Sequence, residues 1–165
     1  MARSTEDTAL ADQRAIRVRR AELSDLASIV ALDTKVTGIA KPEYLADLFE
    51  RYRTRRAGER FFFIAESADS GEETQILGFV IGEIRAWEFG SAPCGWVIGI
   101  SVDPGARSEH IGHALMTAIS AAFRDAGITI MRTMISRKNH LLMSFFRGEG
   151  MMAGPYLQLE KELDR

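Results

Sequence analysis

The sequence has one cysteine, Cys94, among its 165 residues. One cysteine cannot form an internal disulfide or supply a cysteine-rich zinc module. The longest apolar runs, at 61–65 and 96–102, are far shorter than the ~20 residues that cross a bilayer. Residues 1–14 contain no apolar stretch of the kind found in secretory signals. We therefore expect no membrane association and a location in a reducing compartment, the cytoplasm.

The sequence also lacks an excess of charge of either sign. Its 21 lysine and arginine residues oppose 23 aspartate and glutamate residues, so the formal net charge is −2. A chain of this balance is not expected to bind nucleic acid through bulk charge. Hydrophobic residues make up 46% of the sequence, enough for a core in one domain of roughly 150 residues.

Hydrophobic periodicity predicts where helices and strands lie. Residues 1–14 are polar and aperiodic, which predicts a flexible N-terminal segment before one domain at 15–165. Strands are predicted at 15–19, 61–66, 76–85, 94–102, 128–135 and 156–162. Helices are predicted at 24–38, with Ser24 as N-cap, and at 42–56, 111–127 and 139–149. The helix at 42–56 has an apolar stripe of Leu45, Leu48, Phe49 and Tyr52. This order predicts an α/β (α+β) fold, a mixed central sheet flanked by helices. Hairpin-like spacing predicts antiparallel pairing of the strands at 61–66, 76–85 and 94–102.

The most informative segment is 102–116, where a strand is predicted to end, a short loop follows and a helix begins. Backbone N–H groups at a helix start lack intrahelical acceptors and carry the positive end of the helix dipole, which favours a pyrophosphate. Gly112 would let the backbone approach a ligand closely. Arg107 could add charge-assisted contacts. Such joints are common, so a purely structural role stays open for this segment alone.

A second segment, 139–151, follows a strand one helix later, and the two together resemble the GNAT N-acyltransferase superfamily. Members carry V-D-P-x-x-R-G-x-G-I-G-x-x-L-L and, further on, N-x-x-A-x-x-x-Y-x-x-x-G-F. The first motif is matched by Val102, Asp103, Pro104, Arg107, Ile111, Gly112 and Leu115. In register with the second motif are Asn139, Leu142, Phe146, Gly150 and Met151. The resemblance covers about residues 15–163.

The resemblance implies transfer of an acetyl group from acetyl-CoA to a primary amine that attacks the thioester directly. The strand end at 100–102 would separate from its neighbour and pair with the pantetheine arm, which Asn139 would also bind. A backbone N–H there would hold the thioester oxygen, and amides at 107–113 would hold the pyrophosphate. The implied CoA-binding residues are Ile100, Ser101, Val102, Arg107, Ser108, Glu109, His110, Ile111, Gly112, His113, Asn139 and Phe146. The amine could belong to a small molecule or a protein, and a homodimer is common in the family.

Several positions depart from the family pattern. Ser108 and His110 stand at glycine positions of the loop, and the imidazole of His110 either crowds the phosphates or, when protonated, donates to them. Glu109 adds a negative charge nearby. Phe146 stands where tyrosine is usual, and a phenyl ring cannot protonate a leaving thiolate. These departures keep open a weak or inactive CoA-binding regulatory module of the same fold, and an unrelated α/β binding domain.

The remaining candidates for chemistry are few. Ile98 stands where some members carry a carboxylate base. Glu83 is the weak candidate for a general base, which needs a raised pKa; otherwise it is an exposed strand carboxylate. His110 and His113 are three residues apart but lack further ligands, so no metal is expected. Cys94 has no neighbouring histidine or helix start to activate it, so we expect a buried or merely exposed thiol and not a nucleophile.

Overall fold

The computed structural model describes residues 15–54, 56, 58–67 and 75–163, so the predicted flexible segment 1–14 lies outside the described residues. Two units are distinguished, Met1–Met134 and Ile135–Arg165. The first contains strands β1 (Ile16–Arg20), β2 (Arg60–Ser67), β3 (Ile76–Arg85), β4 (Cys94–Val102) and β5 (Met131–Thr133). Its helices are α1 (Leu26–Thr37), α2 (Pro42–Thr54) and α3 (Ile111–Asp125), with short 3-10 helices η1 (Leu23–Asp25), η2 (Glu88–Gly90) and η3 (Pro104–Glu109). The second contains α4 (His140–Gly148).

The five strands form one sheet in the order β1-β2-β3-β4-β5. The first four pair antiparallel, as predicted for β2, β3 and β4, and β4 pairs with β5 in parallel. The predicted mixed sheet with flanking helices is therefore confirmed. The β3–β4 register shifts in the middle: Ile81 lies opposite Gly99, but Gly82 lies opposite Val97. Ile98 is the extra residue, which makes this a β-bulge in β4.

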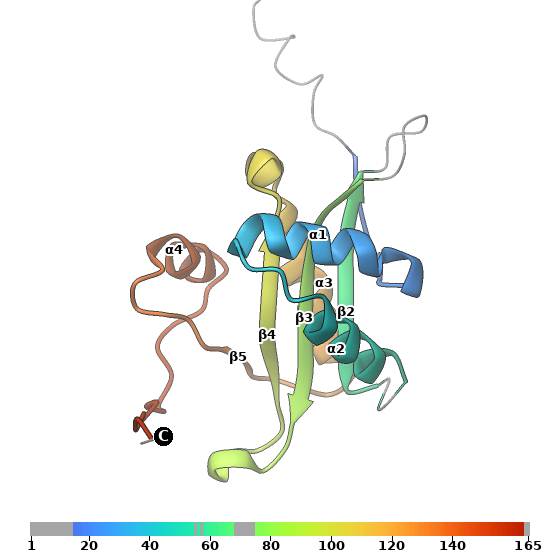
Figure 1. Cartoon of the computed structure of the whole chain (residues 1–165). Helices are drawn as coiled ribbons and strands as arrows, with labels where there is room; N and C mark the ends of the chain where they lie inside the picture. The colour runs from blue at the N-terminus through green and yellow to red at the C-terminus, as the bar shows by residue number, and fades with distance from the viewer. Residues whose placement is uncertain (1–14, 55, 57, 68–74, 164–165) are drawn as a thin grey trace, which may run out of the picture. The chain divides into compact units, whose positions relative to one another are not determined.

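Helices cover both faces of the sheet in the first unit. Figure 1 shows α1 and α2 on one face and α3 on the other. The stripe predicted for α2 is buried against the first face. The core on that face consists of Ile29, Leu32, Leu48, Phe49, Tyr52, Phe62, Ile64, Phe79 and Ile81. None of the described helices has the length and apolar character that a membrane crossing requires.

Glycines in the strands bring α3 close to the second face. A Cβ at Gly78 would lie 2.9 Å from Cγ2 of Ile111, and one at Gly95 would lie 2.5 Å from Cδ2 of Phe123. A Cβ at Gly82 would overlap Ile119 in the same way. Because these glycines lack a side chain, the apolar stripe of α3 packs directly on the backbones of β3 and β4. This packing fixes where α3 begins relative to the end of β4.

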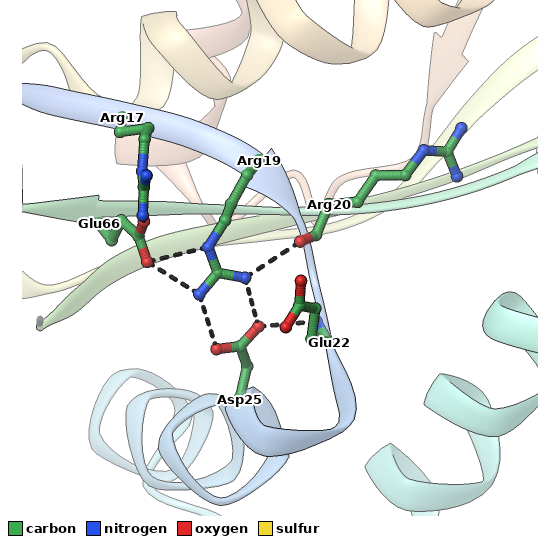
Figure 2. Close-up of polar contacts among 6 residues, drawn as sticks. All are labelled: Arg17, Arg19, Arg20, Glu22, Asp25 and Glu66. Carbon is green, nitrogen blue, oxygen red and sulfur yellow. Dashed lines mark hydrogen bonds and ion pairs between the residues drawn. The ribbon is translucent and has the colours of Figure 1, made fainter.

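Figure 2 shows the ion-pair network that joins β1, β2 and η1. Glu66 is fully buried and binds the guanidinium groups of Arg17 and Arg19. Arg19 also donates to both carboxylate oxygens of Asp25, at 2.7 and 2.9 Å. The Arg19 hydrogen bonds lower the pKa of Asp25. The network holds the first strand to the sheet and sets the direction of the chain as it enters α1.

Three expectations about the elements need correction. The strand predicted at 156–162 is wrong, since the structure shows no strand there. Its apolar alternation is real, but a strand forms only when a neighbour accepts its backbone hydrogen bonds. The strand predicted at 128–135 is confined to Met131–Thr133. Ser24 does not cap α1: it lies inside η1, and Asp25 is the N-cap.

Candidate functional site

The second half of β4 has an open side. β3 pairs with all of β4, whereas β5 pairs only with residues 95–97. After that point, no described residue of the first unit pairs with β4 on this side. The N–H of Asp103 donates to the carbonyl of Leu77 at 2.8 Å, so the alternation of an antiparallel pair turns the N–H and C=O groups of Ile100 and Val102 toward the open side. These groups are suited to an extended ligand that carries amides.

The bulge lies where the pairing with β5 ends. The carbonyl of Val97 accepts a hydrogen bond from Oγ1 of Thr133 at 2.9 Å, and Ile98 follows with its side chain 39% exposed. Bulges are frequent beside active sites because they interrupt pairing and redirect side chains. The bulge therefore marks the start of the open segment. As the sequence indicated, no acid stands at this position.

Asp103 fixes the turn that follows β4. Its carboxylate is buried and accepts hydrogen bonds from Nζ of Lys35, at 2.9 and 2.8 Å, and from the N–H of Gly105, at 2.8 Å. The hydrogen bonds from Lys35 lower the pKa of Asp103, against the opposing effect of burial. The sequence analysis gave this residue only as part of a motif. No sequence signal reveals Lys35, which lies 68 positions away.

The loop after this turn is the short helix η3, which ends at His110. His110 adopts a left-handed conformation, with φ of 57°, and it is also the N-cap of α3. A left-handed residue strains any side chain with a Cβ, so the structure supplies a physical reason for glycine at this place in the family pattern. The side chains of His110 and Arg107 are exposed. Ser108 and Glu109 lie in η3, and only their backbone is described.

The first turn of α3 lies at the end of β4 where the open segment is found. Ile111, on the face of α3 that packs on the sheet, is fully buried, whereas Gly112 is half-buried and His113 is exposed. The first N–H groups of an α-helix point along its axis without an acceptor in the helix. A Cβ at Gly78 would lie 2.9 Å from Cγ2 of Ile111 and 2.9 Å from the carbonyl oxygen of Ser101, so this turn lies beside the end of β4. Such a helix start binds phosphate groups in many proteins.

Asn139 and Phe146 belong to the second unit. The structure therefore brings together only those predicted CoA-binding residues that lie in the first unit. Asn139 is the N-cap of α4, and its Oδ1 accepts from the N–H of Leu142 at 3.0 Å. Phe146 is buried, with its ring centroid 5.3 Å from that of Phe145. The N–H of Met151 donates to the carbonyl of Phe146 at 2.9 Å, beyond the end of the helix.

Glu83 lies in a cluster of polar contacts on β3. Nε of Arg85 donates to its Oε1 at 2.7 Å, the hydroxyl of Tyr52 donates to its Oε2 at 2.8 Å, and Nε of Arg60 lies 3.8 Å from Oε2. Burial disfavours the charged carboxylate, but the hydrogen bonds from Arg85 and Tyr52 outweigh it and lower the pKa of Glu83. A general base needs the opposite shift. Sequence reasoning placed Tyr52 only in the core stripe and missed its hydroxyl contact.

Cys94 is buried, which is one of the two states expected for it. Nη1 of Arg132 lies 3.5 Å from its Sγ and donates to Oγ of Ser91 at 2.8 Å. In the part of the chain that the structure describes, no three histidine, cysteine, aspartate or glutamate side chains gather into a metal-binding group.

Comparisons with known proteins agree with this geometry. The model of the acetyltransferase (GNAT) family matches residues 26–151. The aminoglycoside N-acetyltransferase AAC(6')-Iy, solved in complex with CoA, is 18% identical and superimposes with a TM-score of 0.77, covering 93% of this chain and 98% of that chain. AAC(6')-Ih from Acinetobacter baumannii is 16% identical, with a TM-score of 0.74 and coverage of 91% and 100%.

A transcriptional regulator from Bacillus halodurans is also 16% identical, with a TM-score of 0.73 and coverage of 90% and 100%. No curated protein matches the chain significantly. At these identities, the solved structures show a shared fold. The family match covers most of the chain.

Proposed function

Because this chain belongs to the GNAT family of acetyltransferases and is an N-acetyltransferase that uses an acyl-CoA donor, we propose that it binds acetyl-CoA along the open edge of β4 and over the start of α3. The observation that carries this proposal is the early end of the β5 pairing, which leaves residues 98–102 without a neighbour on that side in the described part of the first unit. The acetyl group then passes to the amine of a small molecule.

The pantetheine arm of CoA contains two amides, and an open strand edge can bind them as it would bind another strand. The N–H and C=O groups of Ile100 and Val102 face that side, so they are the proposed partners. Ser101 lies between them and turns its own backbone toward β3. The contact of Asn139 with the pantetheine arm stays a prediction from the family resemblance; its Oδ1 accepts a hydrogen bond from the N–H of Leu142 and caps α4.

The thioester lies nearest the bulge in this arrangement. The N–H of Ile100 is then the donor for the thioester oxygen, where negative charge develops as the amine attacks. A backbone N–H in a strand is already oriented, so it stabilises the developing charge without a conformational change. Direct attack needs no covalent intermediate on the protein, which holds the two reactants close together.

The pyrophosphate lies over the first turn of α3, between residues 107 and 113. Its negative charge is matched by the helix N-terminus, and the exposed Arg107 adds a cation. Gly112 lets the phosphate approach the backbone. His110 contributes an exposed imidazole beside this turn, and Ser108, Glu109, Ile111 and His113 contribute their backbones.

The role of Glu83 as general base stays a prediction. Its lowered pKa and its contacts with Tyr52 and Arg85 instead support a positioning role for a carboxylate that remains ionised. The described residues and the comparisons give no support to an inactive regulatory module. A small-molecule acceptor is supported by the aminoglycoside acetyltransferases among the similar structures. The single cysteine supports a cytoplasmic location.

The proposed CoA site is tested by thermal unfolding with and without acetyl-CoA, because a ligand of the native state raises the melting temperature. Wild type should be stabilised. Gly112→Glu should lose this effect, since it adds bulk and negative charge at the phosphate position. Thr117→Glu is the matched control: it adds the same side chain at an exposed position of α3 and should keep the effect.

Release of CoA thiol with a panel of amines then tests the transfer itself. With at least one small-molecule amine of the panel, wild type should release CoA thiol and Gly112→Glu should not. No stabilisation by millimolar acetyl-CoA, or equal stabilisation of both variants, would place the cofactor elsewhere.

A further inference from the structure

Asp33 of α1 carries a buried carboxylate that its neighbours satisfy only in part. Its side chain is 8% exposed, and Nζ of Lys41 lies 3.0 Å from its Oδ2. This oxygen is covered, yet it accepts no hydrogen bond from the described residues, so the contact with Lys41 is an ion pair without a well-directed hydrogen bond. Buried carboxylate oxygens ordinarily accept hydrogen bonds, and a buried charge needs a partner. The carboxylate is therefore suited to a cation that fits it better.

The position of α1 places this carboxylate over β4. Figure 1 shows the C-terminal end of α1 crossing in front of β4, and the helix contacts both β3 and β4. Asp33 lies one turn after Ile29, which belongs to the core between this helix and the sheet, so both side chains lie on the sheet side of α1. Further along the helix, Lys35 reaches Asp103 at the end of β4. Asp33 thus lies on the sheet side of the half of α1 that crosses β4.

β4 leaves room on this face at Gly99. Gly99 lies opposite Ile81, which belongs to the same core, so a side chain at this position would point toward the α1 side of the sheet. Apart from its chain neighbours, a Cβ there would have only the side chain of Ile81 within 4 Å among the described residues, at 3.7 Å. The next residue, Ile100, carries the N–H proposed for the thioester oxygen. An amine that approaches this thioester from the α1 side therefore passes over Gly99, below the helix that carries Asp33.

Glu83 lies on the same face but is less available to a further cation, because Arg85 and Tyr52 already donate to it. Lys41, in contrast, can leave Asp33. Its side chain is 35% exposed, and a lysine ammonium is strongly hydrated and lies at the end of a flexible stem. An acceptor amine arrives as an ammonium at neutral pH, since such amines have pKa values of about 10. The acceptor therefore carries the same charged group as the side chain that it would replace.

Building on the proposed transferase function, we propose that Asp33 binds the ammonium group of the acceptor amine, and that Lys41 occupies this position in the free protein. The acceptor displaces Lys41, whose side chain then moves into solvent. Because Lys41 is tethered close to Asp33, its effective concentration there is high. Lys41 thus acts as an internal competitor, and only amines that bind the carboxylate better than this lysine are held for transfer.

Rescue by methylammonium tests the ammonium site without turnover. Lys41→Ala removes the internal cation and should lower the melting temperature by about 2–4 °C. Methylammonium chloride, at a concentration on the order of 100 mM, should recover most of this loss because it binds the native state. Sodium chloride at the same ionic strength should not. The double variant Asp33→Asn/Lys41→Ala is the matched control, and it should show no recovery because it lacks the carboxylate.

Steady-state kinetics with an amine that wild type acetylates provides the second test. Lys41→Ala should lower the KM for the amine by about threefold or more, and Asp33→Asn should raise it by about tenfold or more. The KM for acetyl-CoA should stay unchanged in both. Asp47→Asn removes an exposed carboxylate of α2 and should change neither KM. If the ion pair only held α1 to α2, the two variants would act in the same direction, since each breaks the same contact.

The proposal is overturned if methylammonium stabilises Lys41→Ala no more than sodium chloride does. It is also overturned if the KM for the amine rises in both variants. Because the melting test needs no turnover, an amine panel without any acceptor would count against the proposed function alone. Recovery by methylammonium would then still decide whether Asp33 is an ammonium site.

Discussion

Replacing Asp103 with asparagine should loosen the turn that leads from β4 to the proposed phosphate site. The change keeps the size of the side chain but removes the charge that Lys35 and the N–H of Gly105 contact. Hydrogen bonds to a charged group contribute roughly 1.5–3 kcal/mol. Because Lys35 is more than half exposed, its pair contributes closer to the surface value of below about 1 kcal/mol. We expect a total loss of about 2 kcal/mol in the free energy of unfolding.

For a chain of this length, that loss corresponds to a fall of about 4–8 °C in melting temperature. Urea unfolding at neutral pH measures it directly. Asp47→Asn is the matched control, since Asp47 forms an exposed ion pair with Arg51 on α2, and exposed pairs contribute little. If Asp103→Asn costs no more than Asp47→Asn, the buried carboxylate does not hold the turn.

The same variant has a defined pH dependence. The pKa of Asp103 is lowered in the folded state, so its ionised form stabilises the fold above the unfolded-state pKa of about 3.9. This stabilisation is lost as pH falls through the folded-state pKa. The difference between wild type and Asp103→Asn should therefore be full at neutral pH and shrink in acid. A difference that grows in acid would contradict the assigned cause.

Two further substitutions test the departures from the family pattern. His110→Gly removes the strain of a left-handed residue but gives the unfolded chain more conformational freedom, so the melting temperature should rise by about 1–3 °C. The affinity of this variant for CoA, measured by calorimetry, should differ from wild type by less than about tenfold. The imidazole both crowds the phosphates and donates a hydrogen bond to them, so its removal has two opposing effects. Phe146→Tyr should leave the KM for acetyl-CoA nearly unchanged and raise kcat by up to ~10²-fold if a missing acid limits turnover. A large fall in kcat with unchanged binding would show instead that the surroundings of the Phe146 ring must stay apolar.

Periodicity correctly predicted the helices and strands whose buried face and neighbours can be read from nearby sequence. The stripe of α2 from Leu45 to Tyr52 is buried as predicted, and the close spacing of β2, β3 and β4 indicated their antiparallel pairing. The segment at 156–162 has an equally clear alternation, yet it forms no strand. Alternation shows which face would be buried, but it does not supply the partner strand.

The part of the site that is a local sequence motif could be predicted. The part that depends on contacts between residues far apart in the sequence could not. The motif led to the joint between β4 and α3, because its residues are adjacent in sequence. It did not reveal that Lys35 holds Asp103, or that Tyr52 donates to Glu83 from 31 positions away. The pKa of Glu83 depends on those contacts, so the requirement for a base could be stated from the sequence but not checked. The bulge at Ile98 depends on the register with β3, which a single strand does not show.

The central claim is that acetyl-CoA lies along the open edge of β4, and residue-resolved hydrogen exchange with and without acetyl-CoA tests it most directly. The N–H of Ser101 faces β3 and should be protected in both states. The N–H groups of Ile100 and Val102 face the open side and should gain protection only when acetyl-CoA is bound. Bound acetyl-CoA that leaves the exchange of Ile100 and Val102 unchanged would contradict the account.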